Sequence, residues 1–155
     1  MLKKMYKFPL VCIVFVAMLA LFGPIFSPYS ATDYSGGMFE APSVHHWLGT
    51  NRLGQDLLSQ LLYGTRTSVL IGLCIAVCST ALSVLLGLAA GYLPKFDRVI
   101  NGVANILMVL PNLLLILLVV AFTGAGVIQL VVILSLLSWP GYMRIIRSSV
   151  LTSSM

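Results

Sequence analysis

Three long stretches of the chain contain no Asp, Glu, Lys or Arg, namely Phe8–Thr32, Thr67–Pro94 and Val99–Met143. A helix that crosses the hydrocarbon core of a bilayer needs roughly 20 consecutive apolar residues. The first two stretches are each long enough for one such helix. The third is long enough for two, and FTGAGV (Phe122–Val127) supplies a glycine-rich break between them. We therefore expect an all-α membrane protein with four transmembrane helices, at about residues 8–26, 67–92, 99–121 and 127–143.

The composition agrees with lipid as the solvent. Only 8% of the residues are charged and 59% are hydrophobic, whereas soluble domains carry about 25% charged residues. The net charge of +5 would suit nucleic acid, but the basic residues flank the apolar runs and form no patch. They therefore indicate membrane topology, and we expect the lipid bilayer, not nucleic acid, as a partner.

The first 23 residues, MLKKMYKFPLVCIVFVAMLALFG, combine a basic start with an apolar run, as a signal peptide does. The run is longer than the roughly 7–15 residues of a signal-peptide core, and no A-x-A cleavage site follows it. A lipoprotein signal is also unsuitable, because Val11 precedes Cys12 where a small residue is needed. We expect an uncleaved first span.

Lys and Arg near the ends of spans favour the cytoplasmic side. A cytoplasmic N-terminus leaves only Arg52 and Arg66 outside. It places the other seven basic residues inside, which are Lys3, Lys4, Lys7, Lys95, Arg98, Arg144 and Arg147. The expected organisation is then a cytoplasmic start with the first span (1–26), an external loop (27–66) and a core of three spans (67–155).

The external loop contains a leucine stripe at helical spacing, formed by Leu53, Leu57, Leu58, Leu61 and Leu62. This stripe predicts an amphipathic helix that lies in the outer membrane interface, with Trp47 and Tyr63 at headgroup depth. The polar and interfacial residues assigned to this external helix are Arg52, Asp56, Tyr63 and Arg66. The adjacent His45 and His46 are interpreted as a solvated loop, since further metal ligands are missing beside them.

Small residues recur at intervals of four along the second span, and small faces let helix backbones approach closely in lipid. The helix-packing candidates are Ser68, Gly72, Ala76, Thr80, Gly87 and Gly91. The third span carries Asn101, Asn105 and Asn112 on one face, and Pro111 should kink it. The translocation-pathway candidates are Asn105, Asn112 and Pro111. A pore-facing helix and interhelical hydrogen bonding explain these asparagines equally well.

The sequence contains no phosphate-binding loop, no HExxH and no GxSxG, and its four acidic residues are scattered. Cys12, Cys74 and Cys78 all lie within expected spans, which argues against a disulfide framework. We therefore expect no catalytic residue, no metal site and no cofactor, and a protein that is not an enzyme.

The run HHWLGTNRLGQDLLSQLLYGTRTSVLIG (His45–Gly72) resembles a signature of the C-type permease subunits in the dipeptide/oligopeptide/nickel class of ABC importers. LLGLAAGY, Asp97-Arg98, ILMVLPNLLLILLVVAFTGAG and LSWPGYMRIIRSSVL follow in the order and spacing of that family. The resemblance covers about Ala41 to the last residue.

This resemblance implies the N-terminal part of a type I importer membrane domain in the bacterial inner membrane, which forms part of a pathway for peptides or for nickel or chelated metal. It also implies three kinds of partner: a second permease subunit in a heterodimer, two cytoplasmic ATPase subunits that drive transport, and an external solute-binding protein. The chain departs from the pattern at Asn51, Gln55 and Asn105, where the family commonly has Asp, Arg and an acid.

The chain stops before the EAA coupling loop of the family, so we expect a truncated subunit that does not transport by itself. Two alternatives stay open, a small membrane scaffold or regulator that pairs with an intact permease and a self-associating pore.

Overall fold

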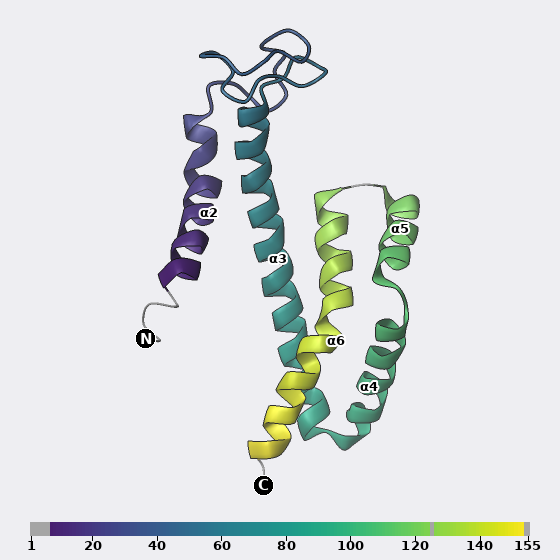
Figure 1. Cartoon of the computed structure of the whole chain (residues 1–155). Coiled ribbons are helices and arrows are strands. Elements are labelled where there is room, and N and C mark those ends of the chain that lie inside the picture. Colours follow the sequence, from purple (N-terminus) through teal and green to yellow (C-terminus); the bar gives the residue numbers. More distant parts are fainter. Residues whose placement is uncertain (1–6, 125, 154–155) are drawn as a thin grey trace. The chain divides into compact units, whose positions relative to one another are not determined.

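The computed structural model describes residues 7–124 and 126–153 and divides into two compact units, one ending at Leu70 and one starting at Ile71. Every named element in the described residues is a helix, and only two isolated bridges, in residues 34–56, have strand-like pairing. The helices, shown in Figure 1, are α2 (Lys7–Phe26), α3 (Leu57–Tyr92), α4 (Pro94–Val109), α5 (Asn112–Thr123) and α6 (Val127–Ser153).

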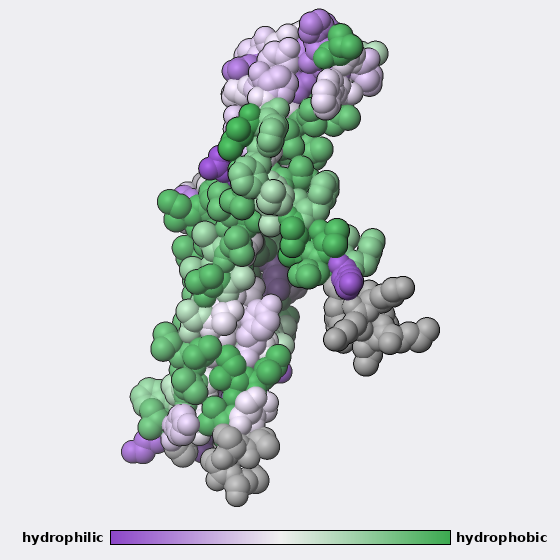
Figure 2. Space-filling view, turned by 90° about the vertical axis from the view of Figure 1, so that its left-hand side faces the viewer, coloured by the Kyte–Doolittle hydropathy of each residue, from purple (hydrophilic) through white to green (hydrophobic). Residues whose placement is uncertain are grey.

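The expected all-α membrane architecture is confirmed. Three of the helices, α2, α3 and α6, are long and apolar enough to cross a membrane, and the bent pair α4–α5 makes a fourth if it is one span. The surface of the helices is largely hydrophobic in Figure 2, whereas the segment between α2 and α3 is mostly polar or intermediate. We call this segment, residues 27–56, the connecting segment.

The separate amphipathic helix expected after the first span is not present as such. Four of its leucines, from Leu57 to Leu62, lie in the first turns of α3, which continues without a break for 36 residues, while Leu53 lies in a turn before it. Nothing between Leu62 and Ser68 interrupts the helix, and the Thr65 and Thr67 hydroxyls donate to the carbonyls four residues earlier. Arg52 and Asp56 precede this helix, while Tyr63 and Arg66 lie within it. At 1.5 Å per residue α3 is about 54 Å long, well beyond the roughly 30 Å of a hydrocarbon core.

The third expected span, 99–121, is two helices instead of one kinked helix. The first of them, α4, begins earlier, with Pro94 in its first turn, where a missing N–H costs nothing. Leu110 is extended (φ −75°, ψ 135°), as the residue before a proline tends to be, and α5 follows at 90° to α4.

The last helix also runs further than expected, from Val127 to Ser153, with Pro140 inside it. It continues past the apolar stretch because its arginines find partners on α4, as described below. Pro140 removes one backbone donor, and membrane helices tolerate this loss when neighbouring groups compensate.

The core of the second unit lies among α3, α4 and α6. Its buried side chains are Ala90, Ile100, Ala104, Trp139 and Met143. Ser83 is fully buried on α3 and donates to the Trp139 carbonyl on α6 (3.1 Å). Small side chains on α3 therefore allow α6 to approach closely.

Only part of the expected helix-packing face meets a neighbour within this chain. A Cβ on Gly87 would lie 3.0 Å from Ile146, and one on Gly91 would lie 2.8 Å from Val150, both on α6. The other four candidates (Ser68, Gly72, Ala76 and Thr80) are exposed, and a Cβ on Gly72 would meet nothing within 4 Å.

We predict that Gly87→Val lowers the stability of the detergent-solubilised protein, because the added methyl groups would press on Ile146 and on the Met143 carbonyl. Overpacking of this kind costs typically about 1–3 kcal/mol. Gly72→Val is the matched control on the same helix. Thermal unfolding should show a lower midpoint for the first variant than for the second, and equal midpoints would contradict the close α3–α6 packing.

Candidate functional site

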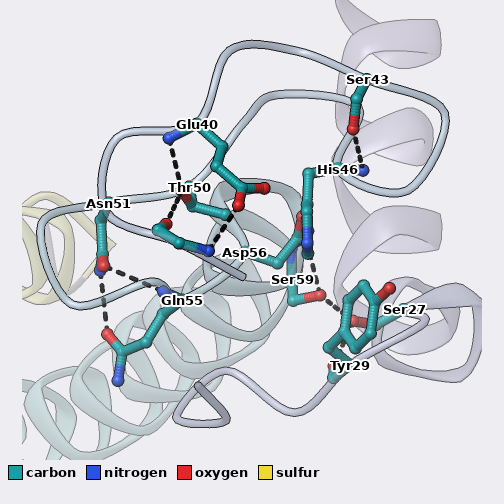
Figure 3. A network of polar contacts seen from close by, with 11 residues as sticks. Ser27, Tyr29, Glu40, Ser43, His46, Thr50, Asn51, Gln55, Asp56 and Ser59 are labelled. Atoms are coloured by element: carbon teal, nitrogen blue, oxygen red, sulfur yellow. Dashed lines mark hydrogen bonds and ion pairs between the residues drawn. The ribbon is translucent and has the colours of Figure 1, made fainter. Parts of the chain in front are cut away.

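The connecting segment has no helix or named strand, and polar contacts to Asp56 hold it together (Figure 3). One carboxylate oxygen of Asp56 lies 3.0 Å from Nδ1 of His46, ten residues earlier. The other accepts hydrogen bonds from the backbone N–H (2.7 Å) and the hydroxyl (2.8 Å) of Ser59. Asp56 is therefore the N-cap of α3 and also the anchor of the loop before it.

Two further contacts extend this network to the end of α2. The Ser27 hydroxyl donates to the Ser59 hydroxyl (2.7 Å), which joins the two helices that flank the segment. The Tyr29 ring lies against the His46 imidazole, with centroids 5.1 Å apart. His46, Asp56 and Ser59 are all buried, with 4%, 1% and 0% exposure.

The environment of Asp56 changes its acidity. Burial by itself would raise the pKa of Asp56, because it penalises the charged form. The hydrogen bonds from Ser59 and His46 and the charge of His46 act in the opposite direction and are together stronger, so the pKa of Asp56 lies below its ordinary value.

Two tight turns bring these groups together, and both need glycine. Gly49 and Gly54 have φ of +76° and +74°, and a Cβ at either position would lie within 2.3 Å of a carbonyl oxygen across the loop. Between them the Asn51 side-chain oxygen accepts from the N–H groups of Leu53 (2.8 Å) and Gln55 (3.1 Å), and Thr50 bridges Glu40 and Gly37.

The interpretation of both histidines as a solvated loop is right for His45, which is exposed, and wrong for His46. The sequence interpretation missed the burial of His46 and its contact with Asp56, because two turns separate these residues and turns have no hydrophobic periodicity. A different kind of signal was present, the repeated Leu-Gly in LGTNRLGQD. Each of its glycines comes just before a polar residue that forms a hydrogen bond within the loop.

A second group of polar residues lies in the other unit, at the break between α4 and α5. Pro111 is the N-cap of α5, and its carbonyl accepts from the N–H groups of Leu114 and Leu115. Asn112 begins α5 and is exposed. Helix ends leave backbone groups without partners inside the helix, so this break places polar groups within an apolar stretch.

The remaining asparagines of the expected face are engaged by hydrogen bonds. The Asn105 side-chain oxygen accepts from Arg144 on α6 (2.6 Å), and the Asn101 amide donates to Asp97 on its own helix (2.7 Å). Arg147 on α6 forms a two-pronged ion pair with Asp97, with one of its hydrogen bonds at 2.7 Å. Asn105 therefore serves interhelical bonding here, and Asn112 does not.

The other residues singled out in the sequence belong to neither group. Arg52 is exposed in the connecting segment, Tyr63 is partly buried, and Arg66 is exposed on α3. Within the described part of the chain, no three His, Cys, Asp or Glu side chains gather as metal ligands would.

Comparison with known proteins decides the family. Residues 83–154 match the family described as "Binding-protein-dependent transport system inner membrane component". The chain is 36% identical over 151 residues to the di/tripeptide transport system permease protein DppC of Pseudomonas aeruginosa, which covers 92% of the chain and 50% of the relative. The chain belongs to this family of ABC importer permeases.

Two further relatives extend the permease match. The oligopeptide transport system permease protein OppC of Mycobacterium tuberculosis is 39% identical over 139 residues (87% of the chain, 47% of the relative). The glutathione transport system permease protein GsiD of Pectobacterium atrosepticum is 35% identical over 136 residues (86% and 45%). The chain thus spans about half the length of the curated permeases it matches, and it is a multi-pass inner-membrane protein.

We predict that Asp56→Asn loosens the connecting segment of this permease chain, since the amide cannot accept from His46 and Ser59 as the carboxylate does. Leaving such buried groups badly paired costs about 1–3 kcal/mol. Hydrogen exchange of the amides in residues 27–60 should become faster. Asp33→Asn, at an exposed carboxylate in the same segment, is the control that should leave exchange unchanged.

The low pKa of Asp56 makes its contacts with His46 and Ser59 depend on pH. A carboxylate with a depressed folded-state pKa stabilises the fold above its unfolded pKa of about 3.9, and this contribution is lost as the pH falls through the folded value. Protection of the segment should therefore fall below about pH 4. If Asp56→Asn lost protection over the same range and to the same extent, another group would be responsible.

Proposed function

We propose that this chain forms part of the translocation pathway of a binding-protein-dependent importer, and that the break between α4 and α5 lines that pathway. The observation that carries the proposal is the 90° bend at Leu110–Pro111 within an apolar stretch. At membrane depth, non-helical backbone is tolerated only where protein buries it or where it lines a water-filled cavity.

Asn112 and Pro111 are the pathway residues in this proposal. Asn112 is exposed in the chain, and a side-chain amide facing hydrocarbon without partners would cost at least about 1–3 kcal/mol. Water or a passing solute would satisfy it. Asn105 has a positioning role instead, because its hydrogen bond to Arg144 joins α4 to α6.

The distribution of basic residues supports a cytoplasmic N-terminus and an external connecting segment. In this orientation the connecting segment contributes to the surface that receives an external solute-binding protein, and its rigid Asp56 network keeps that surface in one conformation. A second permease subunit completes the pathway, and two separate cytoplasmic ATPases supply the energy, so the chain itself is not an enzyme.

Peptides are the proposed solute. The printed names of the three relatives above refer to di- and tripeptides, oligopeptides and glutathione, all of which contain peptide bonds. These names favour peptides over the nickel or chelated metal that the sequence signature leaves open.

We predict that a cysteine at Asn112 reacts with a small charged methanethiosulfonate reagent in the assembled importer, because this position faces water in the proposal. The background variant has alanine in place of Cys12, Cys74 and Cys78. The reaction should slow when peptide and its binding protein are present. To measure its rate, the reagent is quenched after set times and the cysteine that has not reacted is labelled with a fluorescent maleimide.

Leu114→Cys is the matched control, two residues further along α5 and therefore on its opposite side. It should face lipid or protein and react slowly. Equal labelling at positions 112 and 114, or no labelling at 112 in an importer that transports, would reject a pathway role for the break.

The orientation has its own test. We predict that a membrane-impermeant maleimide added to intact cells labels Arg52→Cys and spares Lys95→Cys, because both residues are exposed and should lie on opposite sides of the membrane. Both should react after the cells are permeabilised. The reverse pattern would place the connecting segment in the cytoplasm.

A further inference from the structure

Two hollows meet at Phe26, where α2 ends and the connecting segment begins. The first is a groove of about 360 Å³ along α2, and each of its lining residues is apolar, including Phe15, Met18, Phe22 and Leu62. The second is a pocket of about 350 Å³ in the connecting segment. Phe26 lines both hollows, and Leu58 and Leu62, one turn apart on α3, line the pocket and the groove respectively.

The pocket differs from the groove in its chemistry. Three aromatic side chains line it, from Phe26, Tyr29 and Trp47, together with the exposed His45 and the buried Asp56. Asp56 is the one charged residue in this lining, and Lys and Arg are absent from it. Aromatic faces attract organic cations, and no basic side chain in the lining would repel one, so the pocket is complementary to a positive charge.

We propose that the two hollows together bind one phospholipid with an amine headgroup, such as phosphatidylethanolamine. An acyl chain fills the apolar groove, and the ammonium group lies among the rings of Tyr29, Trp47 and Phe26. The imidazole of His45 can donate a hydrogen bond to the phosphate.

An acyl chain suits the groove, because each residue that lines it is apolar. The groove also lies on the surface of a membrane helix whose neighbouring side chains, Leu10, Val11 and Val14, are exposed, so lipid tails reach it without any rearrangement. The inference depends on the membrane location of the chain and not on its role in transport.

The test is native mass spectrometry of the full chain, titrated with phosphatidylethanolamine or phosphatidylglycerol of identical acyl chains. We expect preferential retention of phosphatidylethanolamine by about two- to fivefold, the ratio that a cation–π contact at a partly exposed site would give. Phe26→Ala should remove the preference and weaken retention of both lipids, and Trp47→Ala should remove the preference alone. Phe8→Ala, an exposed phenylalanine of α2 outside both hollows, should behave as the unmodified chain.

A second measurement uses the unmodified protein, in case Phe26→Ala does not fold. The fluorescence of Trp47, obtained as the difference between the unmodified chain and Trp47→Phe, should be quenched more by acyl-brominated phosphatidylethanolamine than by the equally brominated phosphatidylglycerol. Equal quenching by the two lipids, or a preference for phosphatidylglycerol in either measurement, would overturn the proposal. The proposed function has a separate outcome. If an importer assembled with the unmodified chain showed the lipid preference but took up no peptide, the proposed function would be contradicted and the lipid site would not.

Discussion

A hydrocarbon solvent offers no partner to a backbone N–H or C=O, and this constraint governs the membrane-spanning part of the chain. It explains why the long charge-free stretches are helical and why each departure from helix has a local solution. At Gly124 the N–H returns to the Val120 carbonyl, and at Pro111 the carbonyl accepts from the first turn of α5. The connecting segment bonds across its own turns. At Leu110–Asn112 the backbone leaves the helix within an apolar stretch, and the proposed pathway follows because such backbone must be buried by protein or line a water-filled cavity.

The Asp56 carboxylate combines two tasks that are often separate in proteins. It caps α3 through Ser59 and fixes the preceding loop through His46. The two tasks stabilise each other, because the helix start sets the position of the carboxylate and the buried imidazole keeps it desolvated and paired. A polar run inside an apolar protein thus becomes a compact cap, which can present a defined surface to a binding protein and a defined pocket to a lipid.

The arginines of α6 act both as a topology signal and as hydrogen-bond donors to a neighbouring helix. By topology Arg144 and Arg147 mark the cytoplasmic end of a span, and this is why the sequence predicted a helix that ends near Met143. In the structure they bond to Asn105 and Asp97 on α4, so the helix continues through Ser153. Asn105 provides a neutral acceptor, so its contact with Arg144 is a hydrogen bond and not an ion pair.

The sequence by itself determined the all-α membrane class and the family, because lipid solubility depends on stretches of apolar residues that any reader of the chain can find. It also located the break at Pro111, since proline acts on the backbone next to it. Contacts between distant residues were decided only by the tertiary structure. The His46–Asp56 pair crosses two glycine turns, the Asp97–Arg147 pair joins residues 50 apart, and of two similar rows of small residues only the one with Gly87 and Gly91 meets α6. Periodicity shows that a face exists, but which partner covers it depends on how the helices come together in space.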